Sequence, residues 1–355
     1  MPRARRGGDA YARAGVDVSK VRAIQSGLGA LLSSTFANRE GKFGQPAIGI
    51  GHYAGLIDIG GGRLLGMHTD GVGTKVLVAQ EMGKFDTVGI DCVAMTVNDL
   101  ICLGVEPAAL LDYIALERED DALVRQLSKG LAKGADESGT AIVGGETAIL
   151  GDTIKGVGGR GFDLVSMGVG VVEKKAVIDG SKIRAGDRVL GIASSGLHSN
   201  GYTLARRLVR GLDLKKRVAE LGMGLGESLL TPTRIYVKPT LKAIGNSDVH
   251  GIAHVTGGAF TKLTRLTGAR KLRFSLTEIG DVRVPPIFGF LGRQGRMGRA
   301  EMYLTFNMGV GLCVVVPEGE EPEVLKAYRG SGFEGWEIGT IVEGEGVVVG
   351  STRIS

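Results

Sequence analysis

The pattern of apolar and polar positions predicts helices and strands that alternate along most of the chain. Apolar residues recur at helical spacing in several stretches, and short apolar runs bounded by glycine or polar clusters read as strands. Helices are expected over residues 18–32, 85–104, 121–137 and 321–328, with another beginning at Thr231. Strands are expected over residues 63–67, 108–115, 140–143, 163–173, 188–193, 250–255 and 312–316. The alternation predicts a mixed α/β (α+β) protein.

Chain length indicates how many domains to expect. The chain has 355 residues, which is long for one hydrophobic core, so two domains are expected. A polar stretch with several glycines follows Glu173. We therefore expect an N-terminal domain over residues 1–173 and a C-terminal domain over residues 174–355.

Composition and charge narrow the class of protein. The net charge is +5, but Lys and Arg are spread along the chain and aromatic residues make up only 5%, so a nucleic-acid surface is not expected. The positive charge also fits small anionic substrates. No apolar run approaches the roughly 20 residues of a membrane helix. The three cysteines are scattered, which is typical of a reducing cytoplasm.

The segment from Thr69 to Lys75 is the first candidate site. It reads Thr-Asp-Gly-Val-Gly-Thr-Lys and follows a predicted strand, so Asp70, backbone N–H groups and Lys75 are expected at one strand end. This combination suits a polyphosphate bound through a metal ion. A tight turn with a solvated aspartate is an equally good interpretation. The spacing of a Walker loop, GxxxxGK[ST], is absent from this segment.

Further acids follow in three places. On the helix expected over residues 85–104, Asp91, Asn98 and Asp99 share one face, and no Lys–Glu pairs accompany them. A ligand face is therefore favoured over a solvated one. Asp112 lies in a strand predicted to be buried, where an acid needs a partner. A glycine-rich turn ending in Glu146 is expected after the strand at 140–143, so these acids are candidates to converge on Mg²⁺.

Two glycine-rich segments carry histidines. The segment 194–202 reads Ser-Ser-Gly-Leu-His-Ser-Asn-Gly-Tyr and leads into a predicted helix. His254 precedes the turn Thr256-Gly257-Gly258, which also opens a helix. Such helix starts can bind anions. The alternatives are an ordinary Ser or Asn cap for the first segment and a core histidine for His254.

The motifs, taken together, resemble the aminoimidazole ribonucleotide (AIR) synthetase family. They occur in that family's order over nearly the whole chain. They are Thr69–Lys75, Val97-Asn98-Asp99-Leu100, Leu111-Asp112-Tyr113, Gly144-Gly145-Glu146-Thr147-Ala148, Ser194–Tyr202, Thr231-Pro232-Thr233-Arg234-Ile235-Tyr236-Val237-Lys238, His254-Val255-Thr256-Gly257-Gly258 and Phe306-Asn307-Met308-Gly309-Val310-Gly311.

The resemblance implies a two-domain, AIR synthetase-like fold and an ATP-dependent ligase of purine biosynthesis. It implies closure of the imidazole ring of formylglycinamidine ribonucleotide with ATP and Mg²⁺, in a cytoplasmic homodimer whose N-terminal sheets join into a barrel. Three sets of residues would carry the function. The catalytic set is Asp70, Lys75, Asp99, His198 and His254. The nucleotide- and substrate-binding set is Thr69, Gly71, Gly73, Thr74, Asp112, Gly144, Gly145, Ser195, Gly196, Asn200, Thr256, Gly257 and Gly258. The metal set is Asp70, Asp91, Asn98, Asp99 and Glu146.

The sequence departs from the commoner bacterial pattern of this family at Gln25, His52-Tyr53, the segment 149–152 and Ala259. These departures concern the nucleotide pocket. Two other functions remain: a phosphotransferase of the same superfamily, or a catalytically silent binding subunit. Asp70, Asp99 and Glu146 are all present, which favours an active enzyme.

Overall fold

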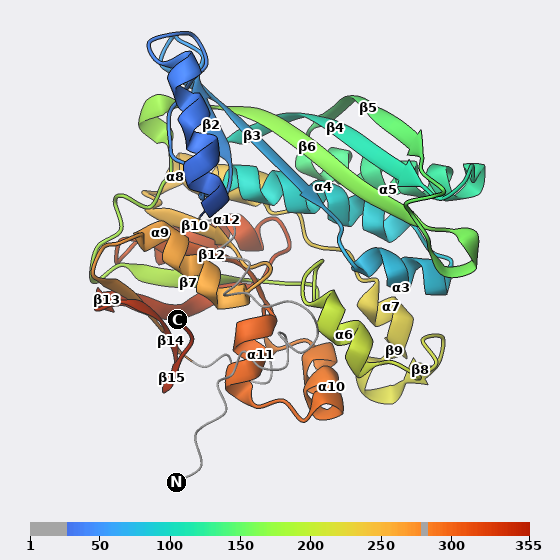
Figure 1. Cartoon of the computed structure of the whole chain (residues 1–355). Coiled ribbons are helices and arrows are strands. Elements are labelled where there is room, and N and C mark those ends of the chain that lie inside the picture. Colours follow the sequence, from blue (N-terminus) through green and yellow to red (C-terminus); the bar gives the residue numbers. More distant parts are fainter. Residues whose placement is uncertain (1–26, 278–282) are drawn as a thin grey trace.

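The computed structural model describes residues 27–277 and 283–355 as two large, stacked β-sheets and a small two-stranded sheet, with helices between and around them (Figure 1). Helix α4 (Asp86–Ile101) contacts strands of both sheets and occupies the centre. Every residue from Val88 to Ile101 is buried. The mixed α/β class predicted from the sequence is confirmed. Of the helix expected over 18–32, residues 27–32 are helical and the rest lies outside the described residues.

The first sheet contains six strands in the order β1-β2-β3-β6-β4-β5. Its neighbouring strands are antiparallel except β4 and β5, which are parallel and joined through helix α5 (Asp121–Ser138). Helices α4 and α5 cover one face of this sheet (Figure 1). The strands are β1 (Gln45–Pro46), β2 (Gly55–Asp58), β3 (Arg63–Gly71), β4 (Glu106–Leu116), β5 (Ala141–Ile149) and β6 (Phe162–Glu173).

The other face of the first sheet is exposed within the chain. Along β4, Leu110 and Ile114 are buried, whereas Leu111 is 43% and Tyr113 is 40% exposed. The prediction of a fully buried strand over 108–115 is therefore wrong for alternate residues, because helices cover only one side and successive side chains point to opposite faces.

Two of the predicted glycine turns lie inside strands instead. Strand β3 continues through Gly71, and β5 runs through the whole Gly144–Thr147 segment. A Cβ atom added to Gly145 would lie 2.5 Å from Oδ1 of Asp112, so this glycine provides space between adjacent strands. In the first motif only Gly73 has a left-handed φ, 69°. The glycine-rich composition therefore reflects close packing as well as turns.

The closest approach of α4 and α5 depends on glycine. A Cβ atom on Gly130 of α5 would lie 1.9 Å from the carbonyl oxygen of Asp86 at the start of α4. Gly89 of α4 faces the same contact, 2.5 Å from the carbonyl oxygen of Leu127 by the same measure. The two helices can therefore approach this closely only because neither position carries a side chain.

We expect Gly130→Ala to lower the free energy of unfolding by about 3 kcal/mol, because the added methyl group forces α5 away from α4. Urea denaturation measures this change. Gly245→Ala in helix α8 (Val237–Asn246) is the matched control, since nothing lies within 4 Å of a Cβ atom there. The control should be neutral or stabilising by roughly 0.5–1 kcal/mol. Equal effects of the two substitutions would contradict the packing argument.

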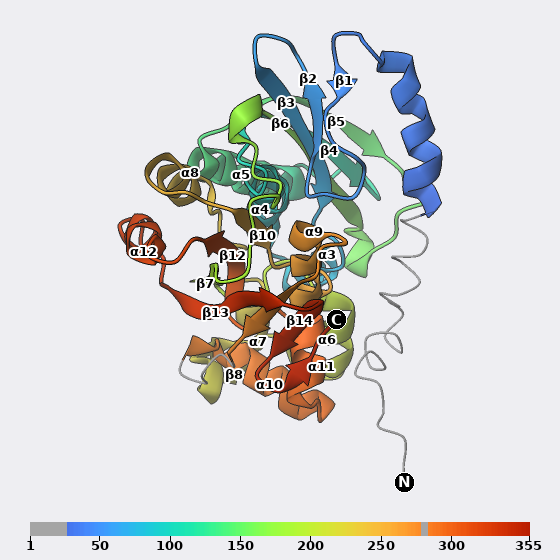
Figure 2. The same ribbon diagram turned by 90° about the vertical axis from the view of Figure 1, so that its left-hand side faces the viewer.

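The second sheet contains seven strands in the order β10-β12-β7-β13-β11-β14-β15. Helices α8 and α12 (Glu321–Arg329) pack together on one side, while the helical turn η5 (Ala259–Leu263), α9 (Thr264–Thr267) and α11 (Arg299–Thr305) lie on the other (Figure 2). The strands are β7 (Arg188–Ala193), β10 (Gly251–His254), β11 (Leu272–Leu276), β12 (Val310–Val316), β13 (Gly335–Glu343), β14 (Gly346–Val349) and β15 (Thr352–Arg353).

The remaining elements connect these layers. They are η1 (Ser34–Arg39), α3 (Lys75–Met82), η2 (Val157–Gly159), η3 (Lys174–Ala176), α6 (Tyr202–Leu208), β8 (Arg217–Val218), η4 (Ala219–Leu221), β9 (Met223–Gly224), α7 (Leu225–Leu229) and α10 (Pro286–Gly295). The strands of the first sheet precede residue 174 and those of the second follow it. The division into two domains at this point stays a prediction.

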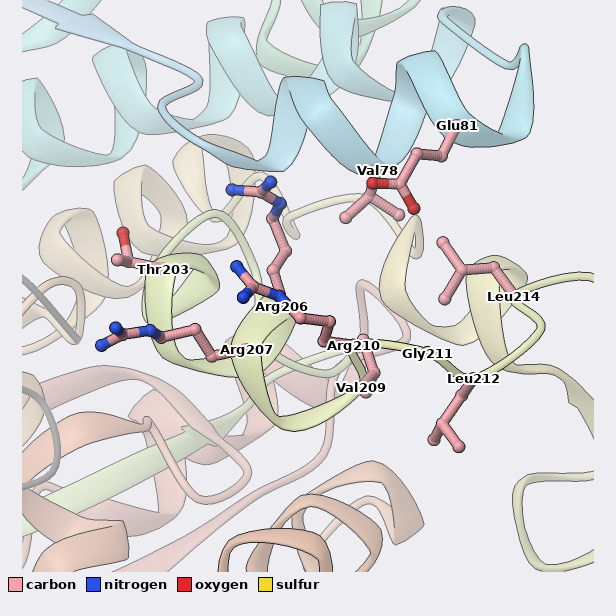
Figure 3. Close-up of a pocket in the computed structure, with 10 residues that line it drawn as sticks. All are labelled: Val78, Glu81, Thr203, Arg206, Arg207, Val209, Arg210, Gly211, Leu212 and Leu214. Carbon is pink, nitrogen blue, oxygen red and sulfur yellow. The ribbon is translucent and has the colours of Figure 1, made fainter. Parts of the chain in front are cut away.

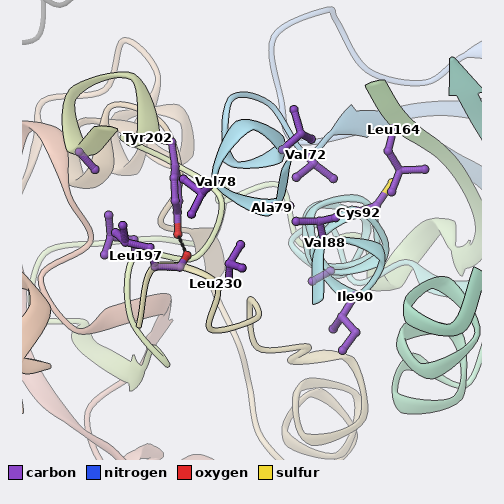
Figure 4. Close-up of a cluster of buried hydrophobic side chains, with 14 of the residues drawn as sticks. Val72, Val78, Ala79, Val88, Ile90, Cys92, Leu164, Leu197, Tyr202 and Leu230 are labelled. Carbon is purple, nitrogen blue, oxygen red and sulfur yellow. Dashed lines mark hydrogen bonds between the residues drawn. The ribbon is translucent and has the colours of Figure 1, made fainter. Parts of the chain in front are cut away.

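A continuous apolar core joins the two halves (Figure 4). Val72 and Val78 on the first half pack in the same cluster as Leu197, Tyr202 and Leu230 on the second. The Tyr202 hydroxyl donates a hydrogen bond to the carbonyl oxygen of Leu229. Over residues 27–277 and 283–355, no helix is both long and apolar enough to cross a membrane.

Candidate active site

A cleft with a volume of about 620 Å³ lies between strands β2 and β3 on one side and the turn after β10 on the other. It brings together predicted site residues from four separate segments of the chain. They are Thr69, Asp70, Asp99, Asn200, Thr256 and Gly257. This convergence makes the cleft the candidate active site.

Two carboxylates face this cleft. Asp70 lies at the end of β3, and its Oδ1 accepts a hydrogen bond from the Gly71 N–H at 2.8 Å. Burial raises the pKa of Asp70, and the nearby charge of Asp99 raises it further. Burial also acts to raise the pKa of Asp99, but the hydrogen bond and charge of His254 outweigh it, so this pKa is lowered. Two neighbouring carboxylates in a partly desolvated cleft favour a divalent cation.

The two acids do not form a complete metal site by themselves. Within the described part of the chain, no group of three or more His, Cys, Asp or Glu side chains is arranged to hold a metal ion. Oxygen atoms of a bound polyphosphate or water would have to complete the coordination. The donor set of Asp70 and Asp99 therefore suits a Mg²⁺ ion that arrives with a nucleotide.

The opposite wall of the cleft carries cationic side chains that the sequence analysis missed. Lys262 and Arg265 line it from η5 and α9, four and seven residues beyond Gly258 of the Thr256-Gly257-Gly258 motif. The guanidinium carbon of Arg265 lies 5.3 Å from the ring centre of Tyr53. Their position just after a glycine turn that opens a helix was the one feature of the sequence that could have indicated an anion-binding role. Acids on one wall and cations on the other suit a metal-bound phosphate.

His52 and His68 also line the cleft. His68 Nε2 is 3.5 Å from Oδ2 of Asp99. Burial lowers the pKa of His52, while Asp179 raises it in part. The sequence analysis noted His52 only as a departure from the family pattern, and it did not assign a role to His68.

His254 lies behind Asp99 and does not line the cleft. The side chain is fully buried, and its Nδ1 is 2.8 Å from Oδ1 of Asp99. Its Nε2 is 3.5 Å from the Nδ2 of Asn98. His254 therefore orients the Asp99 carboxylate. Its predicted place in the catalytic set stays a prediction, and at this position it would act through Asp99.

Asn98 and Asp91 hold a segment of the second half of the chain. Asn98 Nδ2 donates to the carbonyl oxygen of Arg234 at 2.8 Å, and its Oδ1 accepts from the N–H of Tyr236 at 2.9 Å. Asp91 Oδ1 accepts from both the N–H and the hydroxyl of Thr233. Neither side chain faces solvent or the cleft, so neither the ligand face nor the solvated face predicted for α4 describes them.

These hydrogen bonds also correct a helix boundary. The sequence predicted a helix start at Thr231, but α8 begins only at Val237. The backbone N–H groups of Thr233 and Tyr236 are taken by side chains of α4, which replaces the helical hydrogen bonds there. Tertiary contacts thus override a local Thr-Pro start signal.

Lys75 is buried between the halves of the chain and does not reach the cleft. Its exposure is 0%, and its Nζ forms an ion pair with Asp91 Oδ2 at 2.7 Å. Nζ also donates to the carbonyl oxygens of His198 at 3.0 Å and Thr231 at 2.8 Å. Burial lowers the pKa of Lys75, against the opposing effect of Asp91. The predicted contact of Lys75 with a triphosphate is therefore replaced by a structural role.

Hydrogen bonds within the loop between β7 and α6, and from other segments of the chain, fix its conformation. The N–H of Ser195 donates to Nε2 of His198 at 3.3 Å, and the Ser195 hydroxyl donates to the carbonyl oxygen of Pro232. Asn307 Nδ2 donates to the carbonyl oxygen of Gly196 at 2.8 Å. Of the residues predicted in this loop, Asn200 lines the cleft, whereas Ser195, Gly196 and His198 shape the loop.

His198 is buried in a left-handed backbone conformation with φ 63°. Burial lowers its pKa well below 6.5, and the nearby His254 and Lys75 add to this shift. The ring is therefore neutral in the folded protein near pH 7. His198 does not line the cleft, so its predicted catalytic role, contact with phosphate or help in proton transfer, stays a prediction that this position does not support.

Because the unfolded chain binds a proton at His198 more readily, stability should fall as the pH drops below 6.5, the ordinary pKa of histidine. The slope contributed by this residue is at most about 1.4 kcal/mol per pH unit. We expect His198→Asn to reduce the loss of stability between pH 7 and pH 5, as measured by melting curves recorded at several pH values in this range. Asparagine tolerates the left-handed backbone and does not titrate. An unchanged slope would show that His198 is not the titrating group.

The other predicted residues lie away from the cleft. Asp112 and Asp70 both pair with Ser166 of the intervening strand β6, so they lie in one row across the sheet. Glu146 is the strand partner of Tyr113, so its side chain lies on the same exposed face as Tyr113, opposite to the face of Asp70 and Asp112. Those outside the cleft lining are Gly71, Gly73, Thr74, Asp112, Gly144, Gly145, Glu146 and Gly258.

Comparison with protein families identifies both halves of the chain. Residues 51–172 match the model described as AIR synthase related protein, N-terminal domain. Residues 184–351 match AIR synthase related protein, C-terminal domain.

Curated relatives match over almost the whole chain. A phosphoribosylformylglycinamidine cyclo-ligase from Thermococcus kodakarensis is 48% identical over 344 residues, which cover 96% of this chain and 97% of that protein. The protein of the same name from Pyrococcus furiosus is 46% identical over the same shares of both chains. Among solved structures, AaThiL complexed with AMPPCP and TMP is similar, with a TM-score of 0.65 and 18% identity over 93% of this chain and 94% of that one. This last likeness concerns the fold.

Proposed function

Because the chain belongs to the AIR synthase related protein family, we propose that it catalyses the reaction for which its curated relatives are named. It is an ATP-dependent cyclo-ligase of purine biosynthesis that converts formylglycinamidine ribonucleotide and ATP to aminoimidazole ribonucleotide, ADP and phosphate. The observation that carries the proposal is identity of 48% across 96% of the chain, together with a cleft that gathers six motif residues.

The chemistry requires activation of an amide. The formyl oxygen is a poor leaving group. It attacks the γ-phosphorus of ATP, the bond between that phosphorus and the ADP oxygen breaks, and the formyl oxygen then carries the phosphoryl group as a good leaving group. The substrate's ring-closing nitrogen then attacks the formyl carbon, and the oxygen departs with phosphate. Each step moves negative charge through the cleft, which therefore needs cations and hydrogen-bond donors.

Residues of the cleft can meet these needs. We assign Asp70 and Asp99 to Mg²⁺, which neutralises phosphoryl charge when bound. Lys262 and Arg265 are positioned for phosphate oxygens from the opposite wall. Thr256 and Gly257 offer a turn for the ribose phosphate, and Asn200 offers an amide to the substrate. His254 acts as a positioning residue that keeps the Asp99 carboxylate ionised and oriented.

We also propose that the chain works as a homodimer through the exposed face of the first sheet. Large apolar side chains gather there on strands β4, β5 and β6, and a patch of this kind favours protein association. A second copy is a self-complementary occupant for such a face. The side chains are Leu111, Tyr113, Val143, Met167 and Val171, each at least 37% exposed.

Leu111→Glu is expected to convert the dimer to monomers, because a carboxylate would be buried in the interface without a partner. Sedimentation velocity of the full chain measures this change. Met223→Glu, an equally exposed apolar side chain on β9, is the matched control. If wild type is monomeric at micromolar concentration, or if both variants remain dimeric, this face is not the interface.

The three cysteines, all free and buried, fit a reducing compartment, and we propose that the enzyme acts in the cytoplasm.

Turnover of the purified chain tests the proposed reaction. The assay contains ATP, Mg²⁺ and formylglycinamidine ribonucleotide and follows ADP and the aminoimidazole product together. We expect one product molecule per ADP. ADP without ring product would indicate a phosphotransferase of the same superfamily, and neither product would indicate a silent binding subunit.

A further inference from the structure

A second cavity, separate from the cleft, lies between helices α3 and α6 (Figure 3). Its volume is about 360 Å³, and it shares no lining residue with the cleft. Arg206 and Arg210 line it from α6 and the residues just after, and Val78 and Glu81 line it from α3. The proposed reaction uses none of these four residues.

The charges in this cavity are not balanced. Glu81 is the single acid among the lining residues, and Arg206 and Arg210 face the same cavity. Figure 3 shows the side chains of Arg206 and Arg210 extending into the space between α6 and α3, with Glu81 entering from α3. No described carboxylate forms an ion pair with Arg206 or Arg210 at 4.0 Å or less. Two arginines thus share one distant acid.

Arg206 also has an unused donor. Its Nε is buried and has no hydrogen-bond partner among the described residues. Burial lowers the pKa of Arg206; Glu81 opposes this and Arg210 adds to it. The missing partner leaves the Arg206 side chain incompletely hydrogen-bonded, and an anion held between the two arginines would relieve their mutual repulsion.

Basic residues in the last turn of a helix have an ordinary explanation, because they interact favourably with the helix dipole. That effect accounts for the presence of Arg206 in α6. It does not account for Arg210, which lies beyond the end of the helix, or for the buried Nε atom. The convergence of both side chains on one cavity therefore needs a further reason.

We propose that this cavity binds the phosphate group of a small phosphate ester. Arg206 and Arg210 hold the phosphate oxygens, and the apolar wall of Val78, Val209 and Leu214 takes the carbon skeleton. The wall makes an ester a better occupant than a bare ion.

The cavity is connected to the active site through α6. Asn200 lines the cleft two residues before α6 begins, and Thr203 lines the second cavity. The hydroxyl of Thr203 lies 3.4 Å from that of Thr74, in the motif that carries Asp70. A ligand held by Arg206 and Arg210 thus restrains the helix that leads out of the active-site loop.

Isothermal titration of the full chain at constant ionic strength tests the proposal, with phenyl phosphate as the probe and inorganic phosphate as the comparison. We expect phenyl phosphate to bind wild type more tightly than phosphate does, because its ring can pack on the apolar wall. Arg206→Ala and Arg210→Ala should each weaken binding about tenfold or more, the effect of losing a charge-assisted hydrogen bond. Arg125→Ala, which removes an exposed arginine on α5, is the matched control and should bind like wild type.

Lys262→Ala separates this cavity from the cleft and should leave binding of the probe unchanged. Loss of binding in Lys262→Ala with retention in both arginine variants would place the probe in the cleft and overturn the proposal. Absence of binding to wild type would overturn it too. The exposed position of Arg210 keeps its variant interpretable, because the fold should be unaffected and turnover should stay within about twofold of wild type.

Discussion

Asp91→Ala is expected to lower the free energy of unfolding by about 3–5 kcal/mol, because it leaves the Lys75 ammonium buried without its counter-ion. Both side chains are 0% exposed, so water cannot replace the lost carboxylate. The substitution also removes the acceptor for the N–H and hydroxyl of Thr233. Urea denaturation followed by circular dichroism measures the change.

A double variant distinguishes the ion pair from other effects. Lys75→Met combined with Asp91→Leu replaces the pair by apolar side chains and should recover part of the stability lost in Asp91→Ala. Lys75→Met alone should be strongly destabilising as well. If Lys75→Met instead kept full stability and lost only ATP-dependent turnover, Lys75 would be a phosphate ligand, contrary to the geometry described here.

Asp70→Asn should lower kcat by about a hundredfold or more while the protein stays folded, because one charged oxygen ligand for Mg²⁺ is exchanged for a neutral amide. The amide oxygen of asparagine can still accept the hydrogen bond from the Gly71 N–H. A Mg²⁺ titration of turnover should show a weakened response. Stability is checked in the same preparation by thermal melting.

Asp58→Asn is the matched control for Asp70→Asn. Asp58 lies on β2 of the same sheet and pairs with Lys174 at 3.3 Å on the exposed surface. Its turnover should stay near that of wild type. An active Asp70→Asn enzyme would remove this residue from the metal site and leave Asp99 as the remaining candidate.

Local patterns were sufficient to predict much of the fold. Apolar periodicity predicted α5 to within one residue, and the short apolar run at 188–193 coincides with β7. The buried strand near 312–316 is also confirmed as β12. In these elements local propensity and tertiary packing favour the same structure, so the sequence pattern predicts it correctly.

The failures have a common physical cause, which is long-range contact. The sequence does not show that helices cover only one side of β4, nor that α4 takes the backbone donors of Thr233 and Tyr236. It likewise groups Lys75 with Asp70, although the chain turns between them and buries Lys75 against Asp91. Neighbours in a motif need not share a surface.

The candidate site was predicted in part. Asp70, Asp99, Asn200 and Thr256 do line one cleft, as their motifs indicated. Arg265 was missed because its position after the glycine turn does not by itself show that it faces the acids of the cleft, which depends on long-range packing. Glu146 lies on the face away from Asp70, on the surface proposed to meet a second copy.

The fate of one oxygen atom tests the central claim most directly. Formylglycinamidine ribonucleotide carrying ¹⁸O in the formyl group is turned over with ATP and Mg²⁺, and the released phosphate is analysed by mass spectrometry. If the formyl oxygen is phosphorylated before ring closure, each phosphate carries one ¹⁸O atom. Ring product accompanied by unlabelled phosphate, with the label in water, would contradict phosphoryl activation in this cleft.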